Sequence, residues 1–341
     1  MLPVKRADLS DTLTIELTNC CTLACTCCPN GRDRERCRPK HTLDKEQFLP
    51  LLSQIDIPFG HVFLHLHGEP FLNKDLPVMV ELLQKRGVKN FTIFSNAYRI
   101  DLDLLKQVLS KVENDHLELC FSAELYSRAA YEKIRHPGNF DTVWESLGAI
   151  DKVMTEIQMN YTLISIIDSS SIDELKQSVP DIFRRLKQLR DIHFSNAFPW
   201  PHLPQTGDIA GHLTQRRHVC SEIWQLPVIF ASGEVSMCSS DYRGECIVGS
   251  LWEHKYSELM NNRQARRFRR NIAIHHAERN PLCSDCLIDR HIPFSRTAKR
   301  KFIENAKEDV LEKYFNGFHK YFDIDGATHQ EKQTKNVEEY A

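Results

Sequence analysis

The chain has 341 residues, 41% of them hydrophobic and 26% charged, which is enough for a sizeable core and for two domains. Its 44 lysines and arginines are balanced by 46 acidic residues, and the formal net charge of −2 excludes a protein that wraps nucleic acid through an overall basic excess. No apolar run approaches the roughly 18 residues that cross a bilayer, and the first ten residues lack the apolar centre of a secretory signal. We therefore expect a cytoplasmic protein with neither a membrane nor a nucleic acid as partner.

Strand and helix patterns alternate through the first 200 residues. Apolar patterning predicts strands at residues 13–17, 61–66, 90–94, 117–122, 160–167 and 191–195. Apolar residues at helical spacing predict helices at residues 42–54, 76–86, 102–112, 140–157 and 172–189, with Thr42 at the start of the first. Six alternations favour parallel β/α units. Because a closed eight-unit barrel needs roughly 250 residues, we predict an α/β fold with a partial (β/α)6 TIM-like barrel over residues 10–200.

The composition changes after residues 198–204 (FPWPHLP), which predicts a domain boundary. We expect a small second domain over residues 205–295, with a hairpin between residues 228–230 and 235–237 that turns at Gly233. Residues 296–341 are expected to form an amphipathic helix at 300–315 and a frayed tail. A further helix is predicted at residues 257–270. We interpret its five arginines as a solvated helix face rather than a phosphate site: Arg263, Arg266, Arg267, Arg269 and Arg270.

Most of the twelve cysteines fall into two groups. The first group is Cys20, Cys21, Cys25, Cys27 and Cys28, and the second is Cys220, Cys238, Cys246, Cys283 and Cys286. In a reducing compartment, such groups bind metal or carry out redox chemistry more often than they form disulfides.

Cys21, Cys25 and Cys28 have the spacing C-x3-C-x2-C and directly follow the first predicted strand. Three thiolates on one loop can hold three irons of a [4Fe–4S] cluster and leave the fourth iron open to another ligand. A structural zinc site normally has four closed ligands, so this set of three fits zinc poorly.

Residues 15–30 (IELTNCCTLACTCCPN) resemble the cluster loop of the radical S-adenosylmethionine (SAM) superfamily, and residues 10–200 carry further features of that family. The second predicted strand leads into Gly68, Glu69 and Pro70, a GEP motif whose backbone meets the amino group of SAM in the family. The resemblance implies that a [4Fe–4S] cluster binds SAM at its open iron. It also matches Ser95 and Asn96 to a Thr-Asn-Gly-like turn, and Ser122 and Glu124 to a polar segment near the ribose.

The chain departs from the family pattern at three positions. Thr22 follows the first cysteine where Asn is usual, Cys27 stands where an aromatic residue commonly precedes the third cysteine, and His67 replaces the first Gly of GGEP. Cys20 and Cys27 are therefore alternative ligands, although neither preserves the x3/x2 spacing.

The second cysteine group has the pattern C-x12-G-x4-C, formed by Cys220 and Cys238, followed by the pair Cys283 and Cys286. Four such thiolates suit either a structural zinc ion or an auxiliary [4Fe–4S] cluster. The pattern resembles the start of the SPASM extension of radical SAM enzymes. Because no cysteine follows Cys286, the resemblance is to the shortened, twitch form with one auxiliary cluster. Cys246 is left over as either a spare buried thiol or a hydrogen-atom donor.

The resemblance implies an enzyme that cleaves SAM to a 5′-deoxyadenosyl radical, which abstracts hydrogen from a substrate C–H bond. Oxidation of a small polyhydroxylated substrate, such as a sugar or an aminocyclitol, is the leading interpretation, which makes the protein an oxidoreductase. A peptide maturase or epimerase, and a non-catalytic iron–sulfur scaffold, are the alternatives. The implied partners are a small-molecule substrate, with a peptide as the alternative, and an electron donor such as flavodoxin or ferredoxin.

Overall fold

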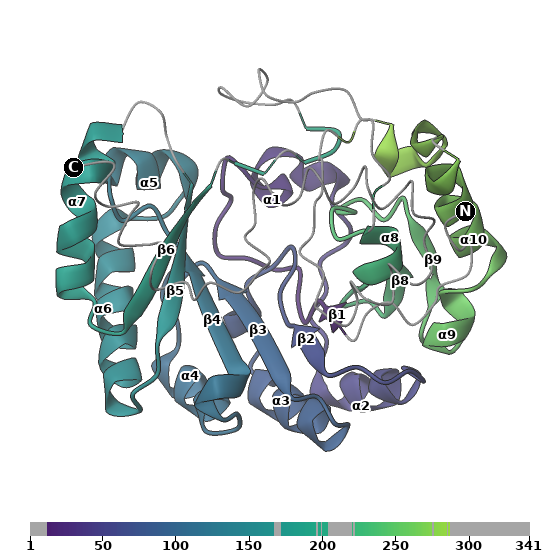
Figure 1. Ribbon diagram of the computed structural model, residues 1–341, viewed down its shortest axis with the longest axis horizontal. Coiled ribbons are helices and arrows are strands. Elements are labelled where there is room, and N and C mark those ends of the chain that lie inside the picture. Colours follow the sequence, from purple (N-terminus) through teal and green to yellow (C-terminus); the bar gives the residue numbers. More distant parts are fainter. Residues whose placement is uncertain are drawn as a thin grey trace, which may run out of the picture.

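Parallel strands form the centre of the molecule (Figure 1), which is a computed structural model describing residues 12–166, 172–195, 197–198, 200–203, 220, 222–274, 276–284 and 286. Six neighbouring strands follow one another in sequence order across the sheet. They are β1 (Thr12–Ile15), β2 (His61–Phe63), β3 (Asn90–Ser95), β4 (Leu117–Ser122), β5 (Tyr161–Ile166) and β6 (Leu189–Ser195), and every neighbouring pair is parallel. The predicted α/β class and partial barrel are thus confirmed. The main difference is that β2 ends three residues earlier than expected.

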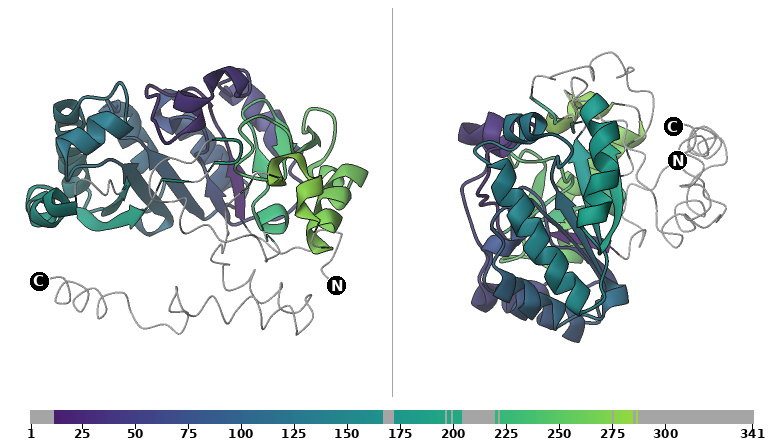
Figure 2. Two further views of the ribbon diagram at one scale, coloured as in Figure 1. Left: turned by 90° about the horizontal axis from the view of Figure 1, so that it is seen from above. Right: turned by 90° about the vertical axis from the view of Figure 1, so that its left-hand side faces the viewer.

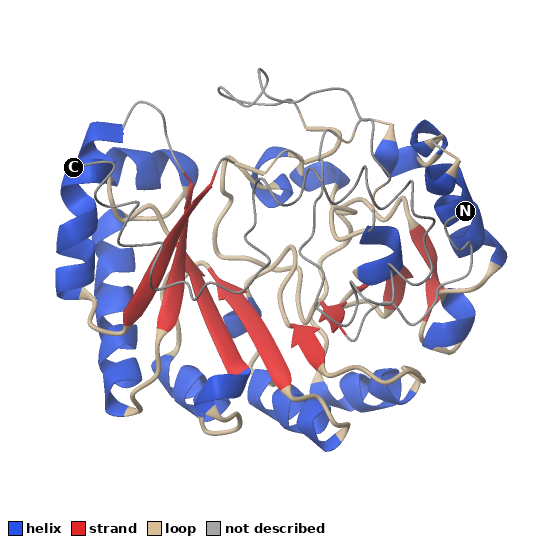
Figure 3. Ribbon diagram, in the orientation of Figure 1, coloured by secondary structure: helices blue, strands red, loops and turns tan. Residues whose placement is uncertain are grey.

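The helices between these strands lie along the outside of the curved sheet (Figures 1 and 3). The predicted ones appear as α2 (Lys45–Ser53), α3 (Leu76–Lys85), α4 (Leu102–Leu109), α6 (Phe140–Glu156) and α7 (Ile172–Arg185). Two further α-helices, α1 (Pro29–Arg32) and α5 (Arg128–Ile134), were not predicted, and short 3-10 turns span Arg34–Arg36, Pro70–Leu72, Asn114–His116, Ala277–Arg279 and Pro281–Cys283. Among the described residues, no helix is long and apolar enough to cross a membrane.

The start of α2 lies further along the chain than the sequence suggested. Asp44 caps the helix by accepting a hydrogen bond from the Gln47 N–H at 2.7 Å, and the Gln47 side chain bonds back to the Asp44 N–H. Thr42 instead hydrogen-bonds to the Thr18 hydroxyl at 2.7 Å. The reciprocal capping box outcompetes a lone threonine because it satisfies two backbone donors at once.

The C-terminal part continues the same sheet. Strand β7 (Val228–Ile229) pairs in parallel with β1, and β8 (Glu234–Ser236) and β9 (Ile247–Ser250) extend the sheet antiparallel. The predicted hairpin is confirmed. Gly233 has φ +86° at its turn, and a Cβ there would lie 2.3 Å from the Trp252 Nε1. The expected domain limits at residues 205, 295 and 296, and the helix expected at 300–315, lie outside the described residues.

The remaining α-helices, α8 (Glu222–Gln225), α9 (Tyr256–Leu259) and α10 (Arg263–Ala273), pack beside this hairpin. The single helix predicted at 257–270 is two helices. Asn262 has extended backbone angles and caps α10 by accepting the Ala265 N–H at 2.9 Å, so the chain must leave helical geometry there.

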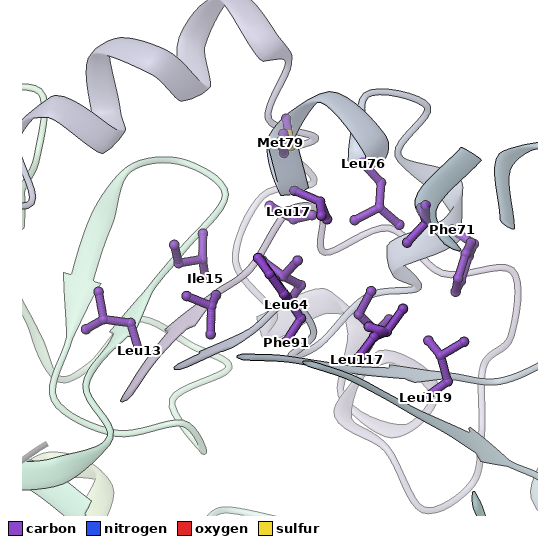
Figure 4. Packing of buried hydrophobic residues seen from close by; sticks show 14 of the residues in the cluster. Leu13, Ile15, Leu17, Leu64, Phe71, Leu76, Met79, Phe91, Leu117 and Leu119 are labelled. Carbon is purple, nitrogen blue, oxygen red and sulfur yellow. The ribbon is translucent and has the colours of Figure 1, made fainter. Parts of the chain in front are cut away.

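One continuous apolar core lies between the sheet and its outer helices (Figure 4). Leu13 and Ile15 come from β1, Phe91 from β3 and Leu119 from β4, and each is at most 1% exposed. Helix α3 contributes the fully buried Leu76 and Met79 to the same cluster. Because β1 to β6 are parallel, their carboxyl ends meet at one rim of the sheet. Ligands bind at this rim in such folds.

Two leucines of α2 test this packing. Leu51 is fully buried whereas Leu49 is 56% exposed on the same helix. Leu51→Ala should lower the free energy of unfolding by about 2–5 kcal/mol, because the deletion leaves a cavity. Leu49→Ala should change it by less than about 0.5 kcal/mol. Urea unfolding of both variants measures the difference, and equal losses would contradict the assigned burial.

Candidate metal centre and cofactor site

The loop after β1 holds the first cysteine group and is hydrogen-bonded to the end of α5 and to the residues that follow it. The Ala24 N–H bonds to the His136 carbonyl at 2.6 Å, and the Thr26 N–H bonds to the Ile134 carbonyl at 2.8 Å. Cys28 then begins the turn that becomes α1. Gly31 is required here because a Cβ would lie 2.3 Å from the Cys25 carbonyl oxygen.

The three predicted ligands on this loop interact electrostatically. Burial, with a smaller contribution from the charge of Cys25, raises the pKa of Cys21 to about 11 and that of Cys28 to about 12. A hydrogen bond with Cys27 lowers the pKa of Cys25 to about 7. Three thiols on one loop suit a site where bound iron supplies the positive charge that stabilises their thiolate forms. This donor set therefore fits the predicted cluster.

The ends of β2 and β3 are joined through Glu69. Its carboxylate accepts the Phe71 N–H at 3.1 Å and the Asn96 N–H at 2.8 Å, and burial raises the pKa of this carboxyl to about 7. Gly68 packs so closely that a Cβ would lie 2.1 Å from the Thr18 carbonyl oxygen. The structure thus brings the GEP turn against the segment that leads into Cys20 and Cys21.

The predicted Ser-Asn-Ala turn lies against the first cysteine loop. The Asn96 Nδ2 lies 3.5 Å from the Cys21 Sγ, and the Asn96 Oδ1 accepts the Tyr98 N–H at 2.8 Å. Ser95 accepts the Ala97 N–H at 3.2 Å. Ala97 has φ 57°, a left-handed conformation in which the family usually places glycine. Sequence reasoning therefore located this turn correctly despite the substitution.

Glu124, expected near the ribose, is fully buried and ion-paired. Arg135 binds it in a bidentate manner at 2.7 and 2.8 Å, and the Ile166 N–H adds a bond of 3.2 Å to the same carboxylate. Ser122 is partly buried two residues earlier, at the end of β4. Its role and that of Glu124 toward a cofactor stay predictions. Both oxygens of Glu124 already accept hydrogen bonds, so its side chain is best suited to holding Arg135 and the end of β5 in place.

Sequence reasoning missed a buried ionic cluster at the same rim. Glu16 is fully buried and bonds to Arg38 at 2.9 Å, and the Arg38 guanidinium also lies next to the His67 Nδ1. Burial alone would raise the pKa of Glu16, but His67 and Arg38 lower it to about 2. Arg38 also lies over the Phe230 ring, 3.4 Å from its centroid.

The His67 Nδ1 lies between two charged groups. It is 3.1 Å from the Arg38 guanidinium and 3.5 Å from the Glu16 Oε1, so it accepts from Arg38 in one tautomer and donates to Glu16 in the other. Burial lowers the pKa of His67, which keeps the ring neutral. The His67 Nε2 is buried and has no hydrogen-bond partner among the residues described here. A buried polar atom of this kind is costly unless a ligand satisfies it.

The second cysteine group gathers beside the hairpin. Burial and then the neighbouring Cys220, Cys246 and Cys283 raise the pKa of Cys238 well above its usual range. The buried Asp241 holds this loop in place by accepting the Gly244, Glu245 and Cys246 N–H groups at 2.8–2.9 Å. The place of Cys286 as a fourth ligand stays a prediction.

Cys246 is only 3% exposed and packs within the apolar core. Burial raises its pKa well above the usual range for a thiol, and Cys283 is among the charges that act on it. The spare buried thiol and the hydrogen donor both remain compatible with this position.

The segments next to the two cysteine sites contact each other. The Tyr242 hydroxyl and the Arg243 side chain both bond to Asp33, which follows α1, and the Arg38 N–H bonds to the Tyr242 carbonyl at 3.0 Å. Trp200 donates to the Cys27 carbonyl at 2.9 Å and lies 5.4 Å from the His67 ring. It thereby brings an indole to the loop position where the family commonly has an aromatic residue.

In the described part of the chain, no three Cys, His, Asp or Glu side chains lie close enough to hold a single metal ion. An iron–sulfur cluster does not need such convergence, because each cysteine binds a different iron.

Comparison with known proteins identifies both parts of the chain. Residues 15–179 match the family model of the radical SAM superfamily. The chain belongs to that superfamily. Residues 220–287 match the SPASM iron–sulfur cluster-binding domain. This radical SAM protein therefore uses a [4Fe–4S] cluster and SAM in its first domain and auxiliary iron–sulfur chemistry in its second.

The curated relatives match about half of the chain. A probable GTP 3′,8-cyclase from Sulfolobus acidocaldarius is 26% identical over 189 residues, which are 51% of this chain and 57% of the relative. A second from Saccharolobus solfataricus is 28% identical over 155 residues, 44% and 47% of the two chains. The chain thus spans about half the length of the curated relatives it matches.

Solved structures share the fold over most of the chain. Native anSMEcpe with bound AdoMet superposes with a TM-score of 0.59 at 13% identity, covering 89% of this chain and 99% of that one. BtrN in complex with AdoMet and 2-DOIA gives a TM-score of 0.53 at 14% identity, covering 84% and 95%.

Glu16 makes stability depend on pH. A shift of its pKa from 4.5 to about 2 corresponds to about 3 kcal/mol of stabilisation. This contribution is complete above the unfolded pKa and is lost as pH falls through about 2. Glu16→Gln should therefore be less stable than the parent protein near neutral pH, and the gap should close in acid. Lys85 and Lys111 lower the pKa of Glu81 to about 2 as well, but this carboxylate lies at the surface, where water and salt screen the ion pairs. Glu81→Gln should therefore cost far less. A pH series of urea unfolding curves measures both, and a gap independent of pH would contradict this role.

Iron content tests the first ligand set. The anaerobically reconstituted protein should carry about eight irons per chain if both clusters are [4Fe–4S], and Cys28→Ala should lower this to about four. Cys37→Ala, in the same segment, is the matched control and should leave iron content unchanged. An equal loss of iron in the control would show that the ligands were assigned wrongly.

Proposed function

We propose that this protein oxidises a small polyhydroxylated substrate, such as a sugar or an aminocyclitol, by radical SAM chemistry. The observation that carries the proposal is the contact between the segments that follow the two cysteine sites. Tyr242 and Arg243, in the loop after Cys238, bond to Asp33, which lies just beyond the loop that holds Cys21, Cys25 and Cys28. A second one-electron centre in the same folded unit suits a reaction that removes two electrons from a substrate.

The residues of the first loop would hold the cluster as three thiolates, Cys21, Cys25 and Cys28. When bound, the cluster and SAM supply a 5′-deoxyadenosyl radical that removes a hydrogen atom from a C–H bond. The protein keeps this loop rigid through the backbone bonds of Ala24 and Thr26. Rigid ligands are what a reactive centre requires, because small displacements of the reacting atoms are costly.

The GEP turn would orient SAM through its backbone rather than through the Glu69 carboxylate. Both oxygens of Glu69 already accept N–H groups, from Phe71 and Asn96. The carboxylate therefore fixes the turn relative to β3. The second cluster would be held by Cys220, Cys238, Cys283 and Cys286, and it supplies a one-electron acceptor.

The chemical nature of the rim supports a substrate with hydroxyl groups. The buried Nε2 of His67 is next to the GEP turn and lacks a partner among the described residues. A hydroxyl group of the substrate, which can both donate and accept, would satisfy it. The Trp200 ring lies 5.4 Å from the His67 ring and adds an apolar surface beside it.

A radical rearrangement of a nucleotide is a second candidate. It is favoured by the 26% identity over 189 residues to a relative named a probable GTP 3′,8-cyclase. The match covers 57% of the relative rather than all of it, so this candidate applies to the shared radical chemistry first.

An anaerobic turnover assay distinguishes these activities. Reduced holoenzyme with SAM should release 5′-deoxyadenosine, and the Cys28→Ala variant should release none. Mass spectrometry of candidate sugars and aminocyclitols should show a product lighter by two hydrogen atoms. A product of unchanged mass from GTP would favour rearrangement, and absence of 5′-deoxyadenosine from the parent protein would favour a scaffold.

Cys246→Ala serves as an internal control in the same assay. Under oxidation the variant should keep its product, because no hydrogen atom returns to the substrate. Loss of an epimerised product in this variant would instead assign Cys246 as a hydrogen donor.

A further inference from the structure

Helix α10 carries a concentration of positive charge that radical chemistry does not use. Residues 263–281 contain six arginines and a single acidic residue, Glu278. Arg269 is fully buried and donates to the Met260 carbonyl, which anchors the helix to α9. The other five are exposed and line a groove of about 1110 Å³: Arg263, Arg266, Arg267, Arg270 and Arg279. We call this the arginine groove.

None of the five exposed arginines forms an ion pair within the described residues. Arg279 acts electrostatically on the neighbouring Glu278, which also bonds to His276 at 2.9 Å. Glu245, which lines the groove too, is bound by His202 at 2.8 Å and by Arg243 at 3.8 Å.

Exposure confirms the predicted solvated face for four of its five arginines, whereas burial of Arg269 contradicts the prediction for the fifth. However, like charges gathered along one groove repel one another within the Debye length of about 8 Å. An anionic partner would relieve that repulsion.

The arginine groove is rigidly attached to the auxiliary cysteine site. Gln264 bonds to the Ile247 carbonyl of β9 at 2.7 Å, and Asn271 bonds to Asn280 at 2.8 Å. Asn280 directly precedes the 3-10 turn Pro281–Cys283, and Pro281 itself lines the groove. A partner in this groove therefore lies beside the turn that carries the Cys283 ligand.

The groove is also well placed for access. Helix α10 lies at the outer end of the molecule, opposite α7, in both the front view and the view from above (Figures 1 and 2). The whole chain has a net charge of −2, so the positive charge is local to this end. A local basic region steers an acidic partner toward one surface.

We propose that the arginine groove docks the acidic face of a small one-electron carrier protein of the flavodoxin class. The partner's role rests on the proposed function, since each SAM cleavage takes one electron. The carrier loses one electron and is thereby oxidised. SAM is reduced by that electron as its C5′–S bond breaks to give methionine and the 5′-deoxyadenosyl radical.

The dimensions and composition favour a protein over a single small anion. The eleven residues of α10 extend for about 16 Å, longer than one phosphate group. Pro281 and Ile274 also line the groove, and Ile274 is 40% exposed. Arginine next to apolar side chains is the composition typical of protein interfaces.

Binding of recombinant flavodoxin to the full-length holoenzyme tests the proposal. Isothermal titration at low and at physiological salt should give an affinity that falls as salt rises. Arg267→Glu with Arg270→Glu should raise Kd by about tenfold or more through lost charge complementarity. The matched control is Lys89→Glu with Lys106→Glu, which makes the same change of net charge on exposed residues beside and on barrel helices. The control should keep the parental Kd.

Hydrogen–deuterium exchange gives a second readout. Added flavodoxin should protect residues 263–281 in the parent protein and in the lysine control, but not in the arginine variant. Circular dichroism confirms that the variants remain folded. These measurements need neither substrate nor turnover, so a failure to oxidise sugars would leave them unaffected.

Four outcomes would overturn the proposal. The first is a Kd that is insensitive to the arginine substitutions, and the second is an equal weakening by the lysine control. The third is protection of residues 263–281 by tripolyphosphate but not by flavodoxin, which would assign the groove to a small anion. Protection already present in the free protein and lost in the arginine variant, with no flavodoxin binding, would assign it to another segment of this chain.

Discussion

The buried carboxylate of Glu16 is the interaction on which the arrangement of the site depends. It accepts the Arg38 guanidinium at 2.9 Å and the N–H groups of His67 and Ala231 at 3.3 Å each. Arg38 lies in the segment after the cysteine loop, His67 in the turn between β2 and the GEP motif, and Ala231 in the C-terminal hairpin. A charge this deeply buried is tolerated only when it is paired and hydrogen-bonded, so the three segments cannot separate without a large free-energy cost.

The same interaction explains why the C-terminal part joins the barrel sheet. The Glu16 N–H bonds to the Ile229 carbonyl at 2.8 Å while β7 pairs with β1, so backbone and side chain of one residue hold the hairpin. The loop after the hairpin then reaches Asp33 through Tyr242 and Arg243. The two cysteine sites are consequently fixed relative to each other by buried contacts rather than by a flexible linker.

Local patterns predicted much of this architecture, and long-range pairing accounts for most of what they missed. Strand alternation, the cysteine spacing and the glycine turn at Gly233 are encoded within short stretches, so the barrel and both cysteine groups were recognisable. Glu16, Arg38 and His67 are separated by 22 and 29 residues, and no periodicity connects them. The break at Asn262 was missed because its cap depends on one side chain at the boundary of two helical patterns.

The departures from the family pattern have physical counterparts in the structure. Ala97 adopts the left-handed conformation, and burial against the core and the turn bonds of Ser95 and Asn96 offset its steric cost. Trp200 reaches the cysteine loop from far along the chain where Cys27 replaces an aromatic residue. His67, in place of glycine, adds a ring that closes the Glu16 cluster.

The charged groups of this protein divide into two kinds with different physical roles. Glu16, Arg38, Glu124 and Arg135 are buried in pairs, where removing either partner leaves an uncompensated charge, so they fix geometry. The arginines of the groove are exposed and form no ion pair among the described residues, so they contribute little to folding and remain available for association. The reactive rim needs rigidity and exclusion of water, whereas an electron donor must arrive and leave. Placing the exposed charge on α10, at the far end of the sheet from β6 but attached to the Cys283 turn, allows both requirements to be met in one chain.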